Sequence, residues 1–147
     1  MRIAIGADHA GFPLKEPTVR WLMERGYDVH DVGTFDEGVS VDYPDFAARV
    51  TESVAAGEAT FGVLFCGTGL GMAIAANKAR GIRAVTCHDV LSARLARQHN
   101  DANVLTMGGR IAAPALAQEV LATFLETRFD GGRHQRRVEE IAGLERS

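Results

Sequence analysis

Short apolar runs alternate with helix-like segments along the whole chain, and this alternation limits the possible folds more than any other feature of the sequence. Runs typical of strands lie at residues 2–7, 28–32, 61–65, 83–87 and 104–107. Helical patterns lie at residues 13–25, 44–56, 70–78, 90–98, 114–127 and 135–144. Strands interleaved with helices predict an α/β fold: a three-layer α/β/α Rossmann-like domain with a five-stranded parallel sheet. Pro17 would remove a hydrogen bond inside the first helix, so we expect that helix to begin late or to bend.

Size, charge and cysteine content narrow the class of protein. The 147 residues, 46% of them hydrophobic, fit a single domain over residues 1–147. A net charge of -3 argues against a broad nucleic-acid-binding surface. No segment is apolar enough for a signal peptide or a membrane span, so we expect a cytoplasmic protein with no nucleic acid and no membrane as partners. Cys66 and Cys87 are too few for a disulfide framework and lack the spacing of a zinc site.

A cysteine stands directly before a glycine-rich turn, Cys-Gly-Thr-Gly-Leu-Gly, at residues 66–71. Because this turn joins a strand to a helix, its main-chain N–H groups favour bound negative charge. Cys66 is either a reactive thiolate or, as free cysteines commonly are, a small buried apolar residue; its place at a strand end favours the reactive thiol. The glycine spacing matches neither the dinucleotide-binding pattern nor a Walker motif. For Cys87, which no glycine turn follows, we expect a structural role.

Polar residues follow several other predicted strands. Open parallel sheets bind ligands beyond the carboxyl ends of their strands, so residues at those ends are candidates for one common pocket. Besides the cysteine turn, three such groups are Asp8 with His9, His88 with Asp89, and Gly108 to Arg110. Asp8 and His9 suit either a cap of the first helix or contacts to a polyhydroxylated ligand.

The last part of the chain concentrates cationic groups in an otherwise acidic sequence. Arg133 and Arg137 are four residues apart, so a helix would place them on one face. This pair suits either a solvated surface or a phosphate dianion, which accepts the forked guanidinium donors bidentately. His99 and Asn100 follow a helical pattern and suit either a polar helix terminus or an acid–base site.

Six motifs, in this order, resemble those of the ribose-5-phosphate isomerase B (RpiB/LacAB) family and cover nearly the whole chain. They are Gly-Ala-Asp-His-Ala-Gly at 6–11, Asp-Tyr-Pro at 42–44, Cys-Gly-Thr-Gly at 66–69, Ala-Ala-Asn-Lys at 75–78, Arg-Gln-His-Asn at 97–100 and Gly-Arg-His-Gln-Arg-Arg at 132–137. The resemblance implies an enzyme that interconverts ribose 5-phosphate and ribulose 5-phosphate through a cis-enediolate, without a metal or an organic cofactor. The alternatives are an isomerase of allose 6-phosphate, galactose 6-phosphate or erythrulose 4-phosphate, and a non-catalytic phosphosugar-binding module.

The resemblance also implies roles for residues of this chain. Cys66 is the base that moves the proton, and His99, with Asp8 assisting, opens the sugar ring. Thr68 and the main-chain N–H groups of the turn stabilise the enediolate. The implied substrate contacts within the turn are Gly67, Gly69, Leu70 and Gly71. The implied phosphate contacts are His9, Arg110, Arg133 and Arg137, and the implied contacts to sugar hydroxyls or the pocket lining are Asp8, Tyr43 and Asn100.

The resemblance further bears on the type of base and on the assembly. Some family members carry a glutamate after the glycine turn in place of the cysteine; that position is Met72 here, so this chain is of the cysteine type. A thiol phosphatase with the Cys-x5-Arg pattern is disfavoured, because Met72 also stands where the arginine would be. Family members form homodimers or dimers of dimers, with the C-terminal segment reaching the neighbouring subunit. Arg133 and Arg137 would then serve the partner's site.

Overall fold

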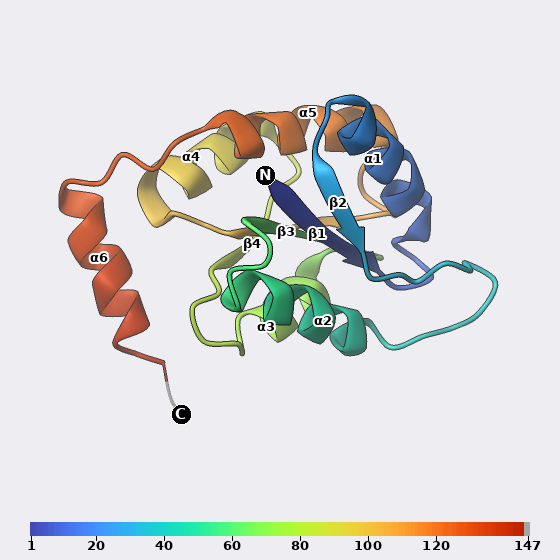
Figure 1. The fold of residues 1–147 in the computed structure, drawn as a ribbon, viewed down its shortest axis with the longest axis horizontal. Coiled ribbons are helices and arrows are strands. Elements are labelled where there is room, and N and C mark those ends of the chain that lie inside the picture. Colours follow the sequence, from blue (N-terminus) through green and yellow to red (C-terminus); the bar gives the residue numbers. More distant parts are fainter. Residues whose placement is uncertain (146–147) are drawn as a thin grey trace.

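The computed structural model, which describes residues 1–145, contains the predicted parallel sheet (Figure 1). Its strands are β1 (Arg2–Ala7), β2 (Asp28–Asp31), β3 (Phe61–Cys66), β4 (Ala84–Thr86) and β5 (Val104–Gly108). Its helices are α1 (Phe12–Glu24), α2 (Tyr43–Ala55), α3 (Leu70–Ala76), α4 (Val90–Asn100), α5 (Pro114–Glu126) and α6 (Arg133–Ala142). The strands lie in the order β2-β1-β3-β5-β4, and every neighbouring pair is parallel. The predicted α/β fold class is confirmed.

The sheet separates two layers of helices, each with its own apolar core (Figure 1). Helices α1, α4 and α5 pack on one face around residues such as Leu22 and Phe124, and α2 and α3 pack on the other around Val50 and Met72. The central strand β3 is buried along its whole length, as expected where helices cover both faces of a parallel sheet. Helix α6 lies outside these layers, beside α4 (Figure 1). No helix within residues 1–145 combines the length and apolarity needed to cross a membrane.

The strand order places Cys66 where parallel sheets commonly bind ligands. From β1 the chain moves outward to β2 and then returns to β3 on the other side of β1. The connections on the two sides therefore diverge between β1 and β3, and such a switch point opens a crevice beyond the carboxyl ends of the strands. Asp8 follows β1 at this point, and Cys66 is the last residue of β3.

The first helix differs from the expectation. Helix α1 begins at Phe12 and continues through Pro17, so of the two expected effects of Pro17, a late start or a bend, the late start is wrong. Pro13 stands in the first turn, where main-chain N–H groups have no acceptor within the helix, so proline removes no helical hydrogen bond there. Lys15 on this helix is fully buried, and its Nζ lies 2.7 Å from the Asp31 carboxylate on β2. This ion pair joins the first helix to the edge strand.

Candidate active site

The Cys66 thiol lies at the end of β3, covered by the turn that follows it. Its residue is only 5% exposed, and Sγ accepts a hydrogen bond from the Gly69 N–H at 3.1 Å. A main-chain donor stabilises a thiolate more than a thiol, because the bond to the anion is charge-assisted. Gly69 has φ +80°, and a Cβ there would lie 2.9 Å from the Met107 backbone, so the turn requires glycine at this point.

Two threonines on the sheet hold the turn in place. The Thr106 hydroxyl on β5 donates to the Gly69 carbonyl at 2.8 Å, and the Thr86 hydroxyl on β4 lies 3.3 Å from the same oxygen. The two hydroxyls are 2.8 Å apart, so they form one network with that carbonyl. Neither threonine carries a signal in the sequence, because threonine inside a strand is ordinary β-sheet composition.

The main-chain N–H groups of the turn fall into two sets. Those of Gly69 and Leu70 donate within the turn, to Cys66 Sγ at 3.1 Å and to Thr68 Oγ1 at 3.3 Å. The N–H groups at positions 67, 68 and 71 donate to no acceptor among residues 1–145. Donors left open beside a reactive group are suited to binding an oxyanion.

Asp8 is buried at the end of β1, against the end of β3. Its N–H donates to the Phe65 carbonyl at 3.2 Å, and its Oδ1 accepts from the Gly11 N–H at 2.9 Å. Gly11 is the N-cap residue of α1, and a Cβ there would lie 2.2 Å from the Phe65 oxygen. The Asp8 carboxylate therefore fixes the start of α1 and lies beside the strand that carries the thiol.

His9 is oriented by the loop that precedes α2. Its Nδ1 accepts a hydrogen bond from the Val41 N–H at 3.1 Å. This bond requires an unprotonated Nδ1, so the neutral ring carries its proton on Nε2. The Nε2–H group is the donor that His9 can offer to an anion.

Tyr43 and Arg110 both contact the cysteine turn. The Tyr43 ring, at the start of α2, lies so close to Gly71 that a Cβ there would be 2.6 Å from it. The Arg110 guanidinium lies against Gly67, where a Cβ would be 3.3 Å from Nη1. Arg110 is exposed and forms no ion pair with any of the residues described. The ends of β1, β3 and β5 thus bring a thiol, a carboxylate, an imidazole and an unpaired guanidinium together.

His99 and Asn100 lie at the opposite end of the sheet from Cys66. They end α4, which leads directly into the start of β5, whereas Cys66 pairs with Gly108 at the end of β5. The length of β5 separates these two ends by about 13 Å, at ~3.3 Å per residue. One chain therefore does not bring the implied ring-opening imidazole to the implied base.

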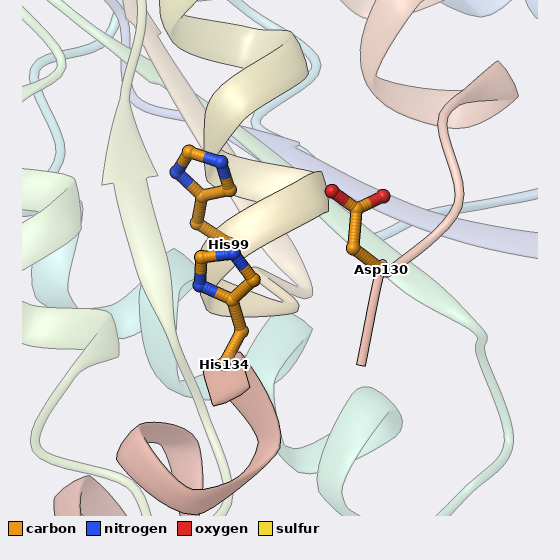
Figure 2. Close-up of side chains that lie close together, drawn as sticks. All are labelled: His99, Asp130 and His134. Carbon is orange, nitrogen blue, oxygen red and sulfur yellow. The ribbon is translucent and has the colours of Figure 1, made fainter. Parts of the chain in front are cut away.

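A cluster around His99 joins α4 to the C-terminal helix (Figure 2). The His99 ring stacks on that of His134, the second residue of α6, with centroids 4.3 Å apart and planes inclined by 11°. The Asp130 N–H donates to the Gln98 carbonyl at 3.0 Å and so ties the preceding loop to α4. Desolvation lowers the pKa of His134, and the nearby His99 and Arg133 lower it further, while Asp130 opposes them. The neutral form of His134 is therefore favoured in this cluster.

The same cluster has the donor types of a metal site but not the arrangement. Nitrogen or oxygen atoms of His99, Asp130 and His134 lie within 4.8 Å of one another. Imidazole nitrogens bind metals along lone pairs that lie in the ring plane, and two nearly parallel stacked planes do not converge on one ion. We assign no metal to this cluster.

Arg133 and Arg137 are exposed one turn apart on α6. Neither forms an ion pair among the residues described, whereas Arg136 lies 3.7 Å from Glu140 on the same helix. The predicted helix is therefore present, and it carries two guanidinium groups available to an anion. The structure places them on the His99 side of the chain and not at the Cys66 turn.

A groove of about 640 Å³ lies between the C-terminal end of α6 and the segment that leads from α3 into the edge strand β4. Its lining includes Lys78, Arg83 and Asn100 together with the apolar Ile141 and Leu144. No residue of the cysteine turn lines it. The groove belongs to the His99 end of the molecule.

Cys87 has the surroundings of an unreactive thiol. It is 3% exposed, and burial, with a smaller effect of Asp89, raises its pKa to about 11. It is therefore uncharged near neutrality, in keeping with the structural role expected from the sequence.

The fold and the cysteine turn define a class of protein: a doubly wound α/β protein with a thiol and a glycine-rich turn at the switch point of its sheet. The family described as Ribose/Galactose Isomerase (LacAB/RpiB) matches residues 3–141. The chain belongs to this family.

Individual relatives match over nearly their full length. Ribose-5-phosphate isomerase B of Escherichia coli is 49% identical over 144 residues, which cover 98% of this chain and 96% of the relative. The crystal structure of a ribose 5-phosphate isomerase of Thermotoga maritima is 52% identical, with a TM-score of 0.95 and coverage of 97% and 98%. The D-erythrulose-4-phosphate isomerase of Pectobacterium atrosepticum is 41% identical, with coverage of 99% and 95%.

Proposed function

We propose that this protein is an aldose–ketose isomerase that interconverts ribose 5-phosphate and ribulose 5-phosphate. The observation that carries the proposal is the cysteine turn, in which a buried Cys66 sulfur accepts a main-chain N–H beside three unused N–H donors. Full-length similarity to relatives named ribose-5-phosphate isomerase B supports the choice of substrate. Each subunit is a single domain over residues 1–147, and we infer a cytoplasmic location, where phosphorylated sugars are retained by their charge.

The proposed chemistry is a proton transfer between neighbouring carbons. As a thiolate, Cys66 removes the C2 proton of the open-chain aldose, and the electron pair left behind forms a cis-enediolate. Thr68 and the open N–H groups of the turn stabilise the developing oxyanion. The Cys66 thiol then delivers a proton to C1, and the proton of the C2 hydroxyl passes to O1, so that C2 becomes the carbonyl carbon of the ketose. The buried Asp8 contacts the sugar hydroxyls.

Ring opening and phosphate binding also need groups that lie at the opposite end of the sheet from Cys66. We infer a homodimer, or a dimer of dimers, in which each cysteine turn is completed by the partner's copies of four residues: His99, Asn100, Arg133 and Arg137. The separation of these residues from Cys66 along the length of β5 supports this arrangement, because no rearrangement within the sheet could join them. His99 acts there as the acid and base that opens the furanose.

The surface around the turn suits contact with a second copy. Helix α3 begins at the turn and exposes Leu70 by 57% and Ile74 by 65%. These residues are four apart, so they form one apolar stripe beside the thiol. The groove beside Asn100, with its apolar Ile141, gives the other end of the chain a complementary apolar surface.

The substrate phosphate is bound from both subunits in this arrangement. His9 offers its Nε2–H, and Arg110 offers a guanidinium without an ion partner, on the side of the cysteine turn. Arg133 and Arg137 come from the partner's α6, where their one-turn spacing suits bidentate contacts to phosphate oxygens.

The direct test is turnover of a panel of sugar phosphates by the purified protein. We expect the highest kcat/KM with ribose 5-phosphate and lower values with allose 6-phosphate, galactose 6-phosphate and erythrulose 4-phosphate. A higher value with one of the other three would reassign the substrate, and the name of the Pectobacterium relative makes the four-carbon sugar the first to compare. Binding of all four without turnover would show a phosphosugar-binding module in place of an enzyme.

A further inference from the structure

His88 forms a hydrogen bond that the proposed chemistry does not use. Two residues beyond the end of β4, its half-buried imidazole accepts the Gly108 main-chain N–H through Nε2, at 2.9 Å. Gly108 is the last residue of the neighbouring strand β5. The bond therefore joins the carboxyl ends of two strands at the edge of the sheet where the cysteine turn lies.

Gly108 is packed directly against the cysteine turn. A Cβ at Gly108 would lie 2.5 Å from the Cα of Thr68 and 2.6 Å from the carbonyl oxygen of Gly67. The next two main-chain N–H groups after Gly108 donate to the carbonyls of Cys66 and Gly67, at 2.8 and 3.0 Å. A displacement of Gly108 would therefore move the thiol, the open N–H donors and the start of the segment that carries Arg110.

We propose that His88 is a positioning residue for the cysteine turn. Its neutral imidazole fixes Gly108, and Gly108 in turn fixes the turn and the adjacent guanidinium of Arg110. Protonation of Nε2 replaces the acceptor with a donor that faces the Gly108 N–H, so the bond is lost and the turn is released. The positioning of Gly108 by His88 does not depend on the proposed isomerase activity. Only the predicted effect of His88 on turnover rests on that function.

Burial, and not the charge nearby, favours the neutral ring of His88. Burial lowers the pKa of His88, and Asp89 opposes this shift. Helix α3 and strand β5, which pack against β4, contain no ionisable side chain. The adjacent Cys87 thiol has its pKa raised to about 11 and is uncharged, and the Arg110 guanidinium lies against Gly67.

The sign of the pH dependence follows from this lowered pKa. Below the ordinary value of 6.5, an unfolded chain takes up a proton at His88 before the folded protein does. Above pH 6.5 the neutral ring makes its full contribution to the stability of the folded protein. It is lost as the pH falls through the lower pKa of the folded state.

Nuclear magnetic resonance tests the link directly in the intact protein. The imidazole nitrogens of His88 and the amide proton of Gly108 are followed from pH 8 to pH 5. We expect both signals to titrate with one midpoint, below 6.5. In His88→Gln the side-chain oxygen occupies a position close to Nε2 and does not titrate, so the Gly108 amide shift should stay constant over this range. A Gly108 amide shift that stays constant while His88 titrates in the wild type, or that still titrates in His88→Gln, overturns the proposal.

Kinetics of the same variants separate positioning from simple loss of a side chain. At pH 7.5 we expect His88→Ala to lower kcat/KM by about three- to tenfold, the size of one hydrogen bond, and His88→Gln to restore most of it. The ratio of kcat/KM for His88→Gln to kcat/KM for the wild type should rise as the pH is lowered from 7.5 to 5.5. Equal losses in the two variants, or a ratio that stays flat, contradict the role. If no sugar phosphate is turned over but the Gly108 amide follows His88, the proposed function fails while the link stands.

Discussion

Gly69 shows how one residue connects the thiol to the sheet. Its N–H donates to Cys66 Sγ, and its carbonyl accepts from the Thr106 hydroxyl. Both bonds depend on φ +80°, which side-chain-bearing residues rarely adopt, and on a close approach to the Met107 backbone. The position of the sulfur therefore depends on a glycine three residues away from it.

We expect Gly69→Ala to lower both stability and activity. The left-handed φ costs an alanine about 1–2 kcal/mol, and the clash with Met107 adds roughly 1–3 kcal/mol. Gly57→Ala is the matched control, because Gly57 has φ +77° and open space where its Cβ would stand. Urea denaturation of both variants gives the free energies of unfolding, and kcat/KM gives the effect on the turn. Equal losses of stability in the two variants would show that the close approach to Met107 is unimportant.

Helix α6 presents its arginines in two different ways. Arg136 has a partner within the helix, Glu140, whereas Arg133 and Arg137 have none among residues 1–145. An exposed pair such as Arg136 with Glu140 contributes little stability. The two unpaired guanidiniums are the part of this helix that can recognise a phosphate.

We expect Arg137→Ala to raise KM for ribose 5-phosphate by about 10- to 100-fold, since a charge-assisted hydrogen bond contributes roughly 1.5–3 kcal/mol. Arg136→Ala removes the same charge from the same helix and should leave KM within about twofold. Steady-state kinetics and competition by inorganic phosphate measure both effects. Similar KM values for the two variants would mean that α6 acts only through its overall charge.

At the scale of the whole molecule, the number and type of helices and strands could be predicted from the sequence. Which strands lie next to each other in the sheet could not. Hydrophobic patterning indicated five strands and six helices, because burial on both faces leaves apolar runs. The order of the strands depends on packing between distant segments. The sequence therefore predicted a common pocket for Asp8 and Cys66 at the strand ends, but not that β1 and β3 are neighbours at the switch point.

The candidate site was predictable to a similar extent. The cysteine turn was identified because glycine spacing is a local signal. The bond from His88 to Gly108 and the buried ion pair of Lys15 with Asp31 left no such signal, since they join residues at least 16 positions apart. Lysine is ordinarily exposed, so its complete burial depends on a partner that only the fold supplies.

A site built from two subunits has a specific signature in mixed assemblies. Cys66→Ala and His99→Ala should each be nearly inactive alone, because each removes one group from every site. A mixed dimer of the two holds one intact site and one doubly altered site, so random mixing should recover about a quarter of the wild-type activity. Co-refolding of the two variants followed by an isomerase assay measures this recovery. No recovery from dimers shown to be mixed would place Cys66 and His99 in the same subunit's site.

The role of Cys66 as the base is tested most directly by proton exchange. Ribulose 5-phosphate is incubated in deuterated water with the wild type and with Cys66→Ala, and deuterium at C2 of the aldose is followed by nuclear magnetic resonance. We expect the wild type to form ribose 5-phosphate with deuterium at C2, because the Cys66 thiol exchanges its proton with the solvent before it protonates C2. Cys66→Ala should do so at least ~100-fold more slowly, the usual effect of losing a general base, while still binding inorganic phosphate. Exchange by Cys66→Ala at the wild-type rate would contradict the assignment of Cys66 as the base.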